Sequence, residues 1–241
     1  RYEDDIPLVV PEVNPERIAD YTKHGIIANP NCSTIQMVVV LKPLHDAVGI
    51  TRVNVATYQA VSGTGRVAIK ELVDQVGELL NGRPVKKTEA YPEQIAFNVL
   101  PHIDEFQDNG YTREEMKMVW ETQKILGDKT VQVNPTAVRV PVLYGHSEAL
   151  HVELKKPLTV AKARALLKKS PGIQVVDSIA RAKYPTVLSH AVGEDDVYVG
   201  RIRQDISHPS GLNLWVVADN VRKGAATNAI QIAEILQREY L

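Results

Sequence analysis

The chain has 241 residues, of which 44% are hydrophobic and 24% charged, proportions ordinary for a globular protein of one large or two small domains. Its 28 basic and 29 acidic side chains leave a net charge of −1, which argues against nucleic acid bound across the whole surface. Since no apolar run approaches the roughly 18 residues of a membrane-spanning helix, we expect neither a nucleic-acid nor a membrane partner.

Strands and helices alternate in the predicted first part of the chain. Apolar runs predict buried strands at 8–10 and 26–28, and Asn14 followed by Pro15 opens a short helix between them. The dense apolar stretch after Cys32 predicts a buried helix. The elements expected next are a strand at 53–59, a flexible turn at 62–65, a helix at 69–80, a polar loop at 81–94 and a strand at 95–100.

Strands dominate the predicted second part. Thr112 and Glu115 form a capping box that opens a helix ending at Leu126. Several strands then follow one another without helices between them, which favours an α+β fold with a mixed, largely antiparallel sheet and helices packed on one face. The expected elements are strands at 130–133, 137–143 and 148–154, a helix at 159–168, strands at 173–177, 197–204 and 211–218, and a helix at 220–238.

The single cysteine, Cys32, stands at the predicted start of a helix, where Asn31 or Ser33 can cap the first turn. Unpaired N–H groups at a helix start favour an anion, so we expect the pKa of the thiol to be lowered and Cys32 to be a candidate nucleophile. The alternative is a small core residue. One cysteine cannot form an internal disulfide, which fits a reducing, cytoplasmic compartment.

Arg139 and His146 are further candidates in the second part of the chain. An arginine inside an apolar strand needs a partner, and a carboxylate ligand would match its fork of donors, unless the side chain simply faces outward. His146 follows Gly145 at a strand end, where it can face a cleft and titrate near neutrality, although a lone histidine is more often an ordinary surface or core residue.

Other polar motifs are weaker. The run Gly63-Thr64-Gly65 lacks the third glycine of a dinucleotide fingerprint, so it indicates only a loop whose backbone can approach a phosphate or a ring. Glu114, Lys117 and Glu121 share one helix face, which a solvated salt-bridge ladder would also explain. We expect no metal site, because no set of histidine, cysteine or glutamate has ligand spacing.

Five segments carry a family resemblance when they are taken together. They are 10–14 (VPEVN), 25–37 (GIIANPNCSTIQM), the turn 62–65 (SGTG), Arg139 followed seven residues later by His146, and 218–226 (ADNVRKGAA). In this combination the chain resembles bacterial aspartate-semialdehyde dehydrogenases over essentially its whole length.

The resemblance implies a reversible, NADP-dependent conversion of aspartyl β-phosphate to aspartate β-semialdehyde and phosphate, through a cysteine thioester and in a homodimer. This step serves lysine, methionine and threonine biosynthesis. The roles that it implies are the nucleophile for Cys32, the acid/base for His146, substrate and phosphate contacts for Gln59, Arg139, Glu114, Lys117 and Arg1, and cofactor contacts for Ser62, Gly63 and Asn220.

The resemblance also implies a division of the chain. We expect 28–217 to be the catalytic and dimerisation domain, with 1–27 and 218–241 as remnants of a Rossmann cofactor-binding domain. Because the chain starts without methionine at Arg1, we expect a cut end and little activity from this chain alone. Two alternatives stay open: an acyl-phosphate reductase similar to N-acetylglutamyl-phosphate reductase, and a non-catalytic dimerising paralogue.

Overall fold

The structure is a computed structural model that describes residues 1–86 and 88–241. Among these residues six strands form one sheet in the order β2-β1-β3-β6-β5-β4. The β1–β2 and β4–β5 pairs are parallel, and the three central pairs are antiparallel. The strands are β1 (Ile50–Gln59), β2 (Gln132–Arg139), β3 (His146–Leu154), β4 (Ile173–Val175), β5 (Val197–Gln204) and β6 (Gly211–Ala218).

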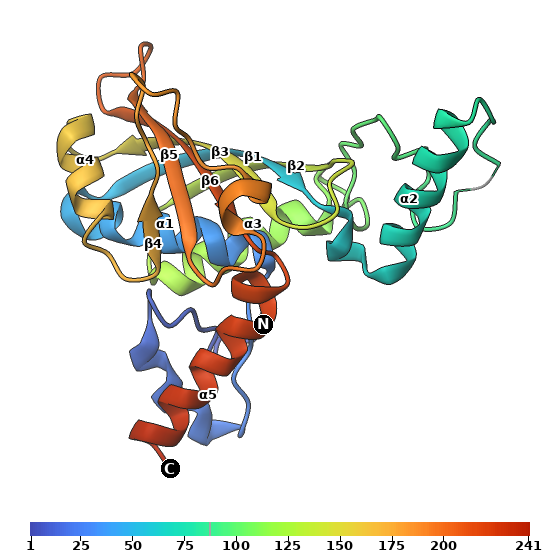
Figure 1. Cartoon of the computed structure of the whole chain (residues 1–241). Coiled ribbons are helices and arrows are strands. Elements are labelled where there is room, and N and C mark those ends of the chain that lie inside the picture. The colour runs from blue at the N-terminus through green and yellow to red at the C-terminus, as the bar shows by residue number, and fades with distance from the viewer. Residues whose placement is uncertain (87) are drawn as a thin grey trace.

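Three helices, α1 (Cys32–Val48), α3 (Arg113–Leu126) and α4 (Val160–Leu167), pack on one face of this sheet (Figure 1). The largest apolar core lies between them and the sheet, and it includes Leu41, Val55 and Leu150. The first part of α1, from Ser33 to Leu41, is buried on all sides and is therefore apolar nearly all round rather than amphipathic. The predicted α+β class, with a mixed sheet and helices on one face, is confirmed.

Helix α2 (Arg66–Leu80) and the loops after it form a lobe that projects from the body (Figure 1). A small apolar cluster holds this lobe together. The carboxylate of Glu71 accepts the N–H groups of Glu89 and Ala90, and the amide oxygen of Gln75 accepts those of Ile95 and Ala96. Side chains of α2 therefore accept main-chain N–H groups that would bond to a neighbouring strand in a sheet.

The strand predicted at 95–100 is wrong, because the N–H groups of Ile95 and Ala96 bond to Gln75 of α2 instead of to a neighbouring strand. Phe97 has a positive φ of 58°, and only Leu100 forms a single bridge, with Arg139. In the same lobe, residue 87 of the predicted loop 81–94 lies outside the described residues, and the predicted turn at 62–65 falls on a short 3₁₀ helix, η2 (Val61–Thr64).

The two ends of the chain pack on each other below the body (Figure 1). The 3₁₀ helix η1 (Pro15–Lys23) meets α5 (Thr227–Glu239) around Val9, Ile18 and Ile232. Lys223 is fully buried there, and its ammonium donates to Glu12 at 2.6 Å, to Asn228 at 3.1 Å and to Gln231 at 2.7 Å.

Several predicted boundaries need correction. The strands expected at 130–133 and 137–143 are one strand, β2, which ends at Arg139. The last helix begins at Thr227 rather than at 220, because the π-helical turn η4 (Arg222–Ala226) precedes it. The strands expected at 8–10 and 26–28 reduce to one bridge between Leu8 and Ala28.

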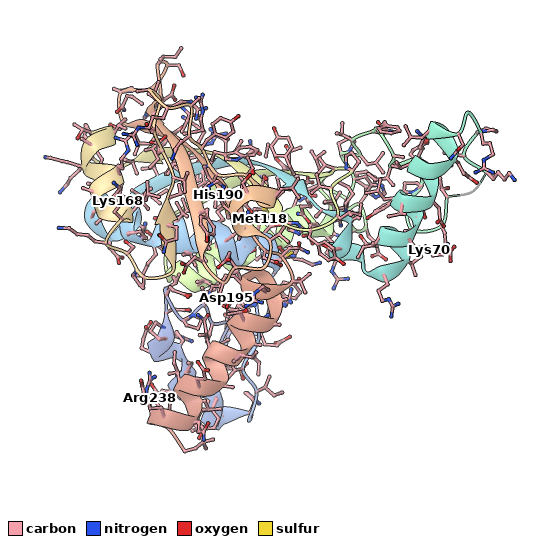
Figure 2. The ribbon with its side chains drawn as sticks, in the orientation of Figure 1. Lys70, Met118, Lys168, His190, Asp195 and Arg238 are labelled. Atoms are coloured by element: carbon pink, nitrogen blue, oxygen red, sulfur yellow. The ribbon has the colours of Figure 1, made fainter. Side chains whose placement is uncertain are left out.

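A second π-helical turn, η3 (Val187–Ala191), was not predicted. Figure 2 shows Met118 of α3 inside the body, whereas Lys70 and Arg238 lie on the projecting lobe and on α5. Across the described part of the chain, none of the helices combines the length and the hydropathy that crossing a membrane would require.

Candidate active site

A cleft of about 620 Å³ lies where the first turns of α1 and α3, the end of β1 and segment 220–225 meet. Nine of the ten predicted site residues line it. They are Arg1, Cys32, Gln59, Ser62, Gly63, Glu114, Lys117, Arg139 and Asn220; the tenth, His146, lies buried behind Gly63.

Cys32 is half-buried at the first position of α1, as predicted. Asn31 is the N-cap, and its side-chain oxygen accepts the N–H of Ser33 at 3.0 Å. Gly224 lies directly against the cysteine, since a Cβ built at that glycine would stand 2.9 Å from Cβ of Cys32. The thiol is therefore held between the helix start and the turn η4.

The expected lowering of the thiol pKa is wrong. Burial raises the pKa of Cys32 to about 12, and the negative charge of Glu114 adds to the rise. The positive charge of Arg139 and the hydrogen bonds from Ser33 offset only part of it. The N–H groups of the helix start therefore do not outweigh desolvation beside a carboxylate, and Cys32 is a thiol in the ligand-free protein.

Arg139 lies at the end of β2 and is buried at 4% exposure, which rules out the outward-facing alternative. Its Nη1 donates to the carbonyl oxygen of Ala60 at 2.7 Å. Its buried Nε has no hydrogen-bond partner within residues 1–86 and 88–241. A buried guanidinium with a donor left over beside a cleft suits a carboxylate ligand.

His146 is fully buried at the start of β3, so the expectation that it titrates near neutrality is wrong. Burial, and then the positive charge of Arg139, lower its pKa to about 3. Its Nδ1 accepts the N–H of Ala60 at 3.0 Å, so the neutral ring carries its proton on Nε2. Among the described residues this Nε2 has no partner, which leaves a donor behind Gly63.

Glu114 and Lys117 extend from the first turns of α3 into the cleft. Glu114 Oε1 accepts from Nδ2 of Asn31 at 2.9 Å and from Nε2 of Gln59 at 3.3 Å. Lys117 donates to the other oxygen of Glu114 at 3.2 Å and to Asp104 at 2.7 Å. Because Glu114 is 5% exposed, the alternative of a solvated salt-bridge ladder is wrong.

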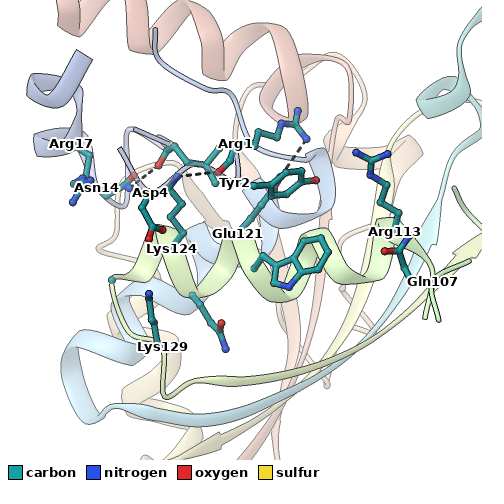
Figure 3. A pocket seen from close by; sticks show the side chains of 14 residues that line it. Arg1, Tyr2, Asp4, Asn14, Arg17, Gln107, Arg113, Glu121, Lys124 and Lys129 are labelled. Carbon is teal, nitrogen blue, oxygen red and sulfur yellow. Dashed lines mark hydrogen bonds and ion pairs between the residues drawn. The ribbon is translucent and has the colours of Figure 1, made fainter. Parts of the chain in front are cut away.

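Arg1 enters the cleft from the N-terminal segment. Its Nη1 donates to Oε1 of Glu121 at 3.3 Å, and its Nη2 donates to the carbonyl oxygen of Pro30 at 3.4 Å. On the other side of this arginine is a second cavity of about 890 Å³, which Arg1, Tyr2, Trp120 and Lys124 help to line (Figure 3).

The predicted cofactor contacts lie together at one end of the cleft. Ser62 and Asn220 exchange hydrogen bonds of 3.1 and 3.0 Å, and Oδ1 of Asn220 also accepts the N–H of Gly145 at 2.8 Å. At Gly63 a Cβ would stand 3.0 Å from Nη1 of Arg139. The glycine backbone and the two polar side chains suit the polar edge of a planar ring.

The roles of Glu121, Asp104 and Gly224 were not predicted. The sequence places Glu121 on the same helix face as Glu114, two turns further on, and this spacing is a usable signal. The contacts of Asp104 and Gly224 join segments that are distant along the chain, so no local pattern could reveal them.

Comparisons with known proteins agree with this geometry. Residues 41–223 match the family model described as semialdehyde dehydrogenase, dimerisation domain. The whole chain is 74% identical to aspartate-semialdehyde dehydrogenase of Legionella pneumophila and spans 69% of that protein.

Solved structures give the same result. The crystal structure of aspartate semialdehyde dehydrogenase II from Vibrio cholerae, complexed with ASA, matches the whole chain with a TM-score of 0.97 and 60% identity, over 70% of that chain. The enzyme from Candida albicans with NADP matches 98% of the chain with a TM-score of 0.71 and 28% identity, over 67% of its own length.

Proposed function

This chain belongs to the aspartate-semialdehyde dehydrogenase family, and from that premise we propose that its cleft reversibly converts aspartyl β-phosphate to aspartate β-semialdehyde. One observation carries the proposal: a single cysteine at a helix start, a buried glutamate and an arginine meet in one cleft. A buried donor of this arginine has no hydrogen-bond partner among the described residues.

Cys32 is the proposed nucleophile. Its sulfur bonds to the acyl carbon, the bond from that carbon to the phosphate oxygen breaks, and the thiol proton leaves with the phosphate. The resulting thioester accepts a hydride more readily than a carboxylate would. Breaking the carbon–sulfur bond afterwards releases the aldehyde, and the sulfur takes up a proton from water to restore the thiol of Cys32.

His146 is the proposed acid/base. Because its Nδ1 already accepts a backbone N–H, the proton available is the one on Nε2. In this tautomer Nε2 can donate a hydrogen bond to the oxygen that becomes negative in each tetrahedral intermediate. A neutral imidazole at neutral pH can do so without leaving a buried positive charge beside Arg139.

The other cleft residues hold the substrate. Arg139 would bind the α-carboxylate through its spare donor, and Glu114 would bind the α-amino group. Gln59 would orient the substrate, and Lys117 with Arg1 would bind the phosphate. Glu114 would bind a free amine, so an N-acetylated substrate is not favoured. The high identity to a named dehydrogenase disfavours both an N-acetylglutamyl-phosphate reductase and a non-catalytic paralogue.

NADP is the proposed cofactor, with Ser62, Gly63 and Asn220 holding its nicotinamide end. When bound, it would supply or accept the hydride. These three residues would contact only the nicotinamide end of the dinucleotide. We propose that 1–27 and 218–241, which pack on each other, belong with the cofactor-binding side, and that 28–217 carries catalysis and dimerisation.

The sheet face without α1, α3 and α4 is the proposed homodimer surface. Tyr58 and Trp215 stand on this face with ring centroids 5.5 Å apart, and Tyr58 is 38% exposed. An aromatic pair beside an open sheet is suited to burial against a second copy. A free, uncrosslinked thiol fits work in the cytoplasm.

Protection of Cys32 from iodoacetamide tests the proposal, because the single cysteine makes the labelling unambiguous. We expect aspartate semialdehyde to slow the labelling at concentrations where propionaldehyde, which lacks the carboxylate and the amine, does not. Arg139→Lys should abolish the difference between the two aldehydes. Equal protection by both aldehydes in the unmodified protein would remove the proposed substrate from this cleft.

A further inference from the structure

Glu121 is a buried carboxylate that touches both halves of the proposed reaction centre without lining the cleft. It is 1% exposed on α3, two turns after Glu114. Its Oε2 accepts the main-chain N–H of Asn31 at 2.7 Å, and its Oε1 accepts from Nη1 of Arg1 at 3.3 Å. One side chain thus links the residue ahead of Cys32 to the arginine that enters the cleft.

Neighbouring contacts reinforce this link. Lys124, less than one turn further along α3, donates to the carbonyl oxygens of Arg1 at 3.0 Å and of Glu3 at 2.5 Å. Figure 3 shows Glu121 and Lys124 extending from α3 toward the side chain and the main chain of Arg1. Asn31 is itself held at its backbone by Glu121 and at its amide by Glu114.

We infer that Glu121 is a positioning residue that fixes Arg1 and the main chain ahead of Cys32 at one separation. The inference rests on the proposed function, in which Arg1 binds the phosphate that Cys32 displaces. In an acyl phosphate one oxygen joins the phosphorus to the attacked carbon, so the spacing between the two binding groups matters. A shared carboxylate on one rigid helix sets that spacing before substrate arrives.

Glu121→Gln separates this role from a purely electrostatic one. The amide oxygen can still accept the N–H of Asn31, but the ion pair with Arg1 is lost. Removing a negative charge near the cleft should tighten phosphate binding if charge alone mattered. Loss of positioning should instead weaken it, so the two explanations predict opposite signs.

The measurement is the Kd for inorganic phosphate by phosphorus NMR titration, with iodoacetamide labelling of Cys32 and a thermal melt of each variant. We expect Glu121→Gln to raise the Kd about fivefold or more, with the labelling rate within about twofold of the unmodified protein. Glu105→Gln, which removes an exposed charge in the loop that precedes the same helix, is the matched control and should leave the Kd unchanged. If Glu121→Gln fails to fold, Glu121→Asp keeps the charge but shortens the reach, and it should weaken phosphate binding in the same direction.

A double-mutant cycle with Arg1→Ala completes the test. Arg1→Ala alone should weaken phosphate binding, and Glu121→Gln should have no further effect in its presence. If Arg1→Ala weakens binding while the Glu121 variants leave the Kd unchanged or lower it, the positioning role is overturned and the proposed function stands. If Arg1→Ala has no effect, the phosphate role of Arg1 is wrong, and the inference falls with it.

Discussion

Replacing Gly224 with alanine tests the packing of turn η4 on the nucleophile. The new Cβ would stand 2.9 Å from Cβ of Cys32 and 3.4 Å from the carbonyl oxygen of Asp219. The first distance is shorter than carbon atoms tolerate, and Cβ of Cys32 cannot swing away because it is fixed to the first residue of α1. The turn must therefore move away from the helix start.

Overpacking a close contact with one extra methyl group should lower the free energy of unfolding by about 1–3 kcal/mol. At about 2–4 °C per kcal/mol for a chain of this size, the melting temperature should fall by about 2–12 °C. Moving the turn also exposes Cys32 to water. Because burial is the largest cause of its raised pKa, the variant should react faster with iodoacetamide than the unmodified chain.

Gly77→Ala is the matched control, since it adds the same methyl group inside helix α2. A Cβ at that position has nothing within 4 Å among the described residues. Alanine is the better helix former, so this variant should melt at the same temperature or higher, by up to about 1 kcal/mol of stability. A Gly224→Ala protein that melts and labels like Gly77→Ala would refute the contact between η4 and Cys32.

Four further outcomes are expected. The labelling rate of Cys32 should climb about tenfold per pH unit from pH 7 to 10, because the thiolate fraction grows in that proportion below a pKa of about 12; a plateau below pH 9 would contradict the burial argument. In a protein of the relatives' full length, Arg139→Lys should lower kcat/KM for aspartate semialdehyde at least tenfold with little change in the melt, and a loss below about threefold would remove Arg139 from the site. Tyr58→Glu should convert a dimer to a monomer in light scattering, because it would bury a charge in each copy at the proposed interface; an unchanged mass would exclude that face. Lys223→Met leaves Glu12 without its buried partner and should lower the free energy of unfolding by roughly 3–5 kcal/mol in urea titration, whereas a change below about 1 kcal/mol would show that the pair is dispensable.

Local features of the site were predictable because they depend on residues close in the chain. Asn31 caps α1 and Thr112 with Glu115 caps α3, as their spacing indicated. The alternation of apolar residues likewise predicted β1 to within a few residues, and the strands expected at 197–204 and 211–218 match β5 and β6. The strand expected at 95–100 failed because Gln75, which lies twenty residues earlier in the sequence than Ile95, accepts the N–H groups of Ile95 and Ala96 at 3.0 Å.

The fold class and the helix start at Cys32 follow from caps and periodicity, which lie in neighbouring residues, whereas most of the cleft residues were implied by the family resemblance. The charge states and contacts of these residues depend on the folded chain. The helix start alone would favour a thiolate, but burial and Glu114 raise the pKa of Cys32 to about 12. His146 is neutral because burial and Arg139 oppose its protonation. Desolvation and the effect of charges from residues distant in the sequence depend on which residues are neighbours in space. For the same reason, the contacts of Glu121 with Arg1 and Asn31 are visible only in the folded chain.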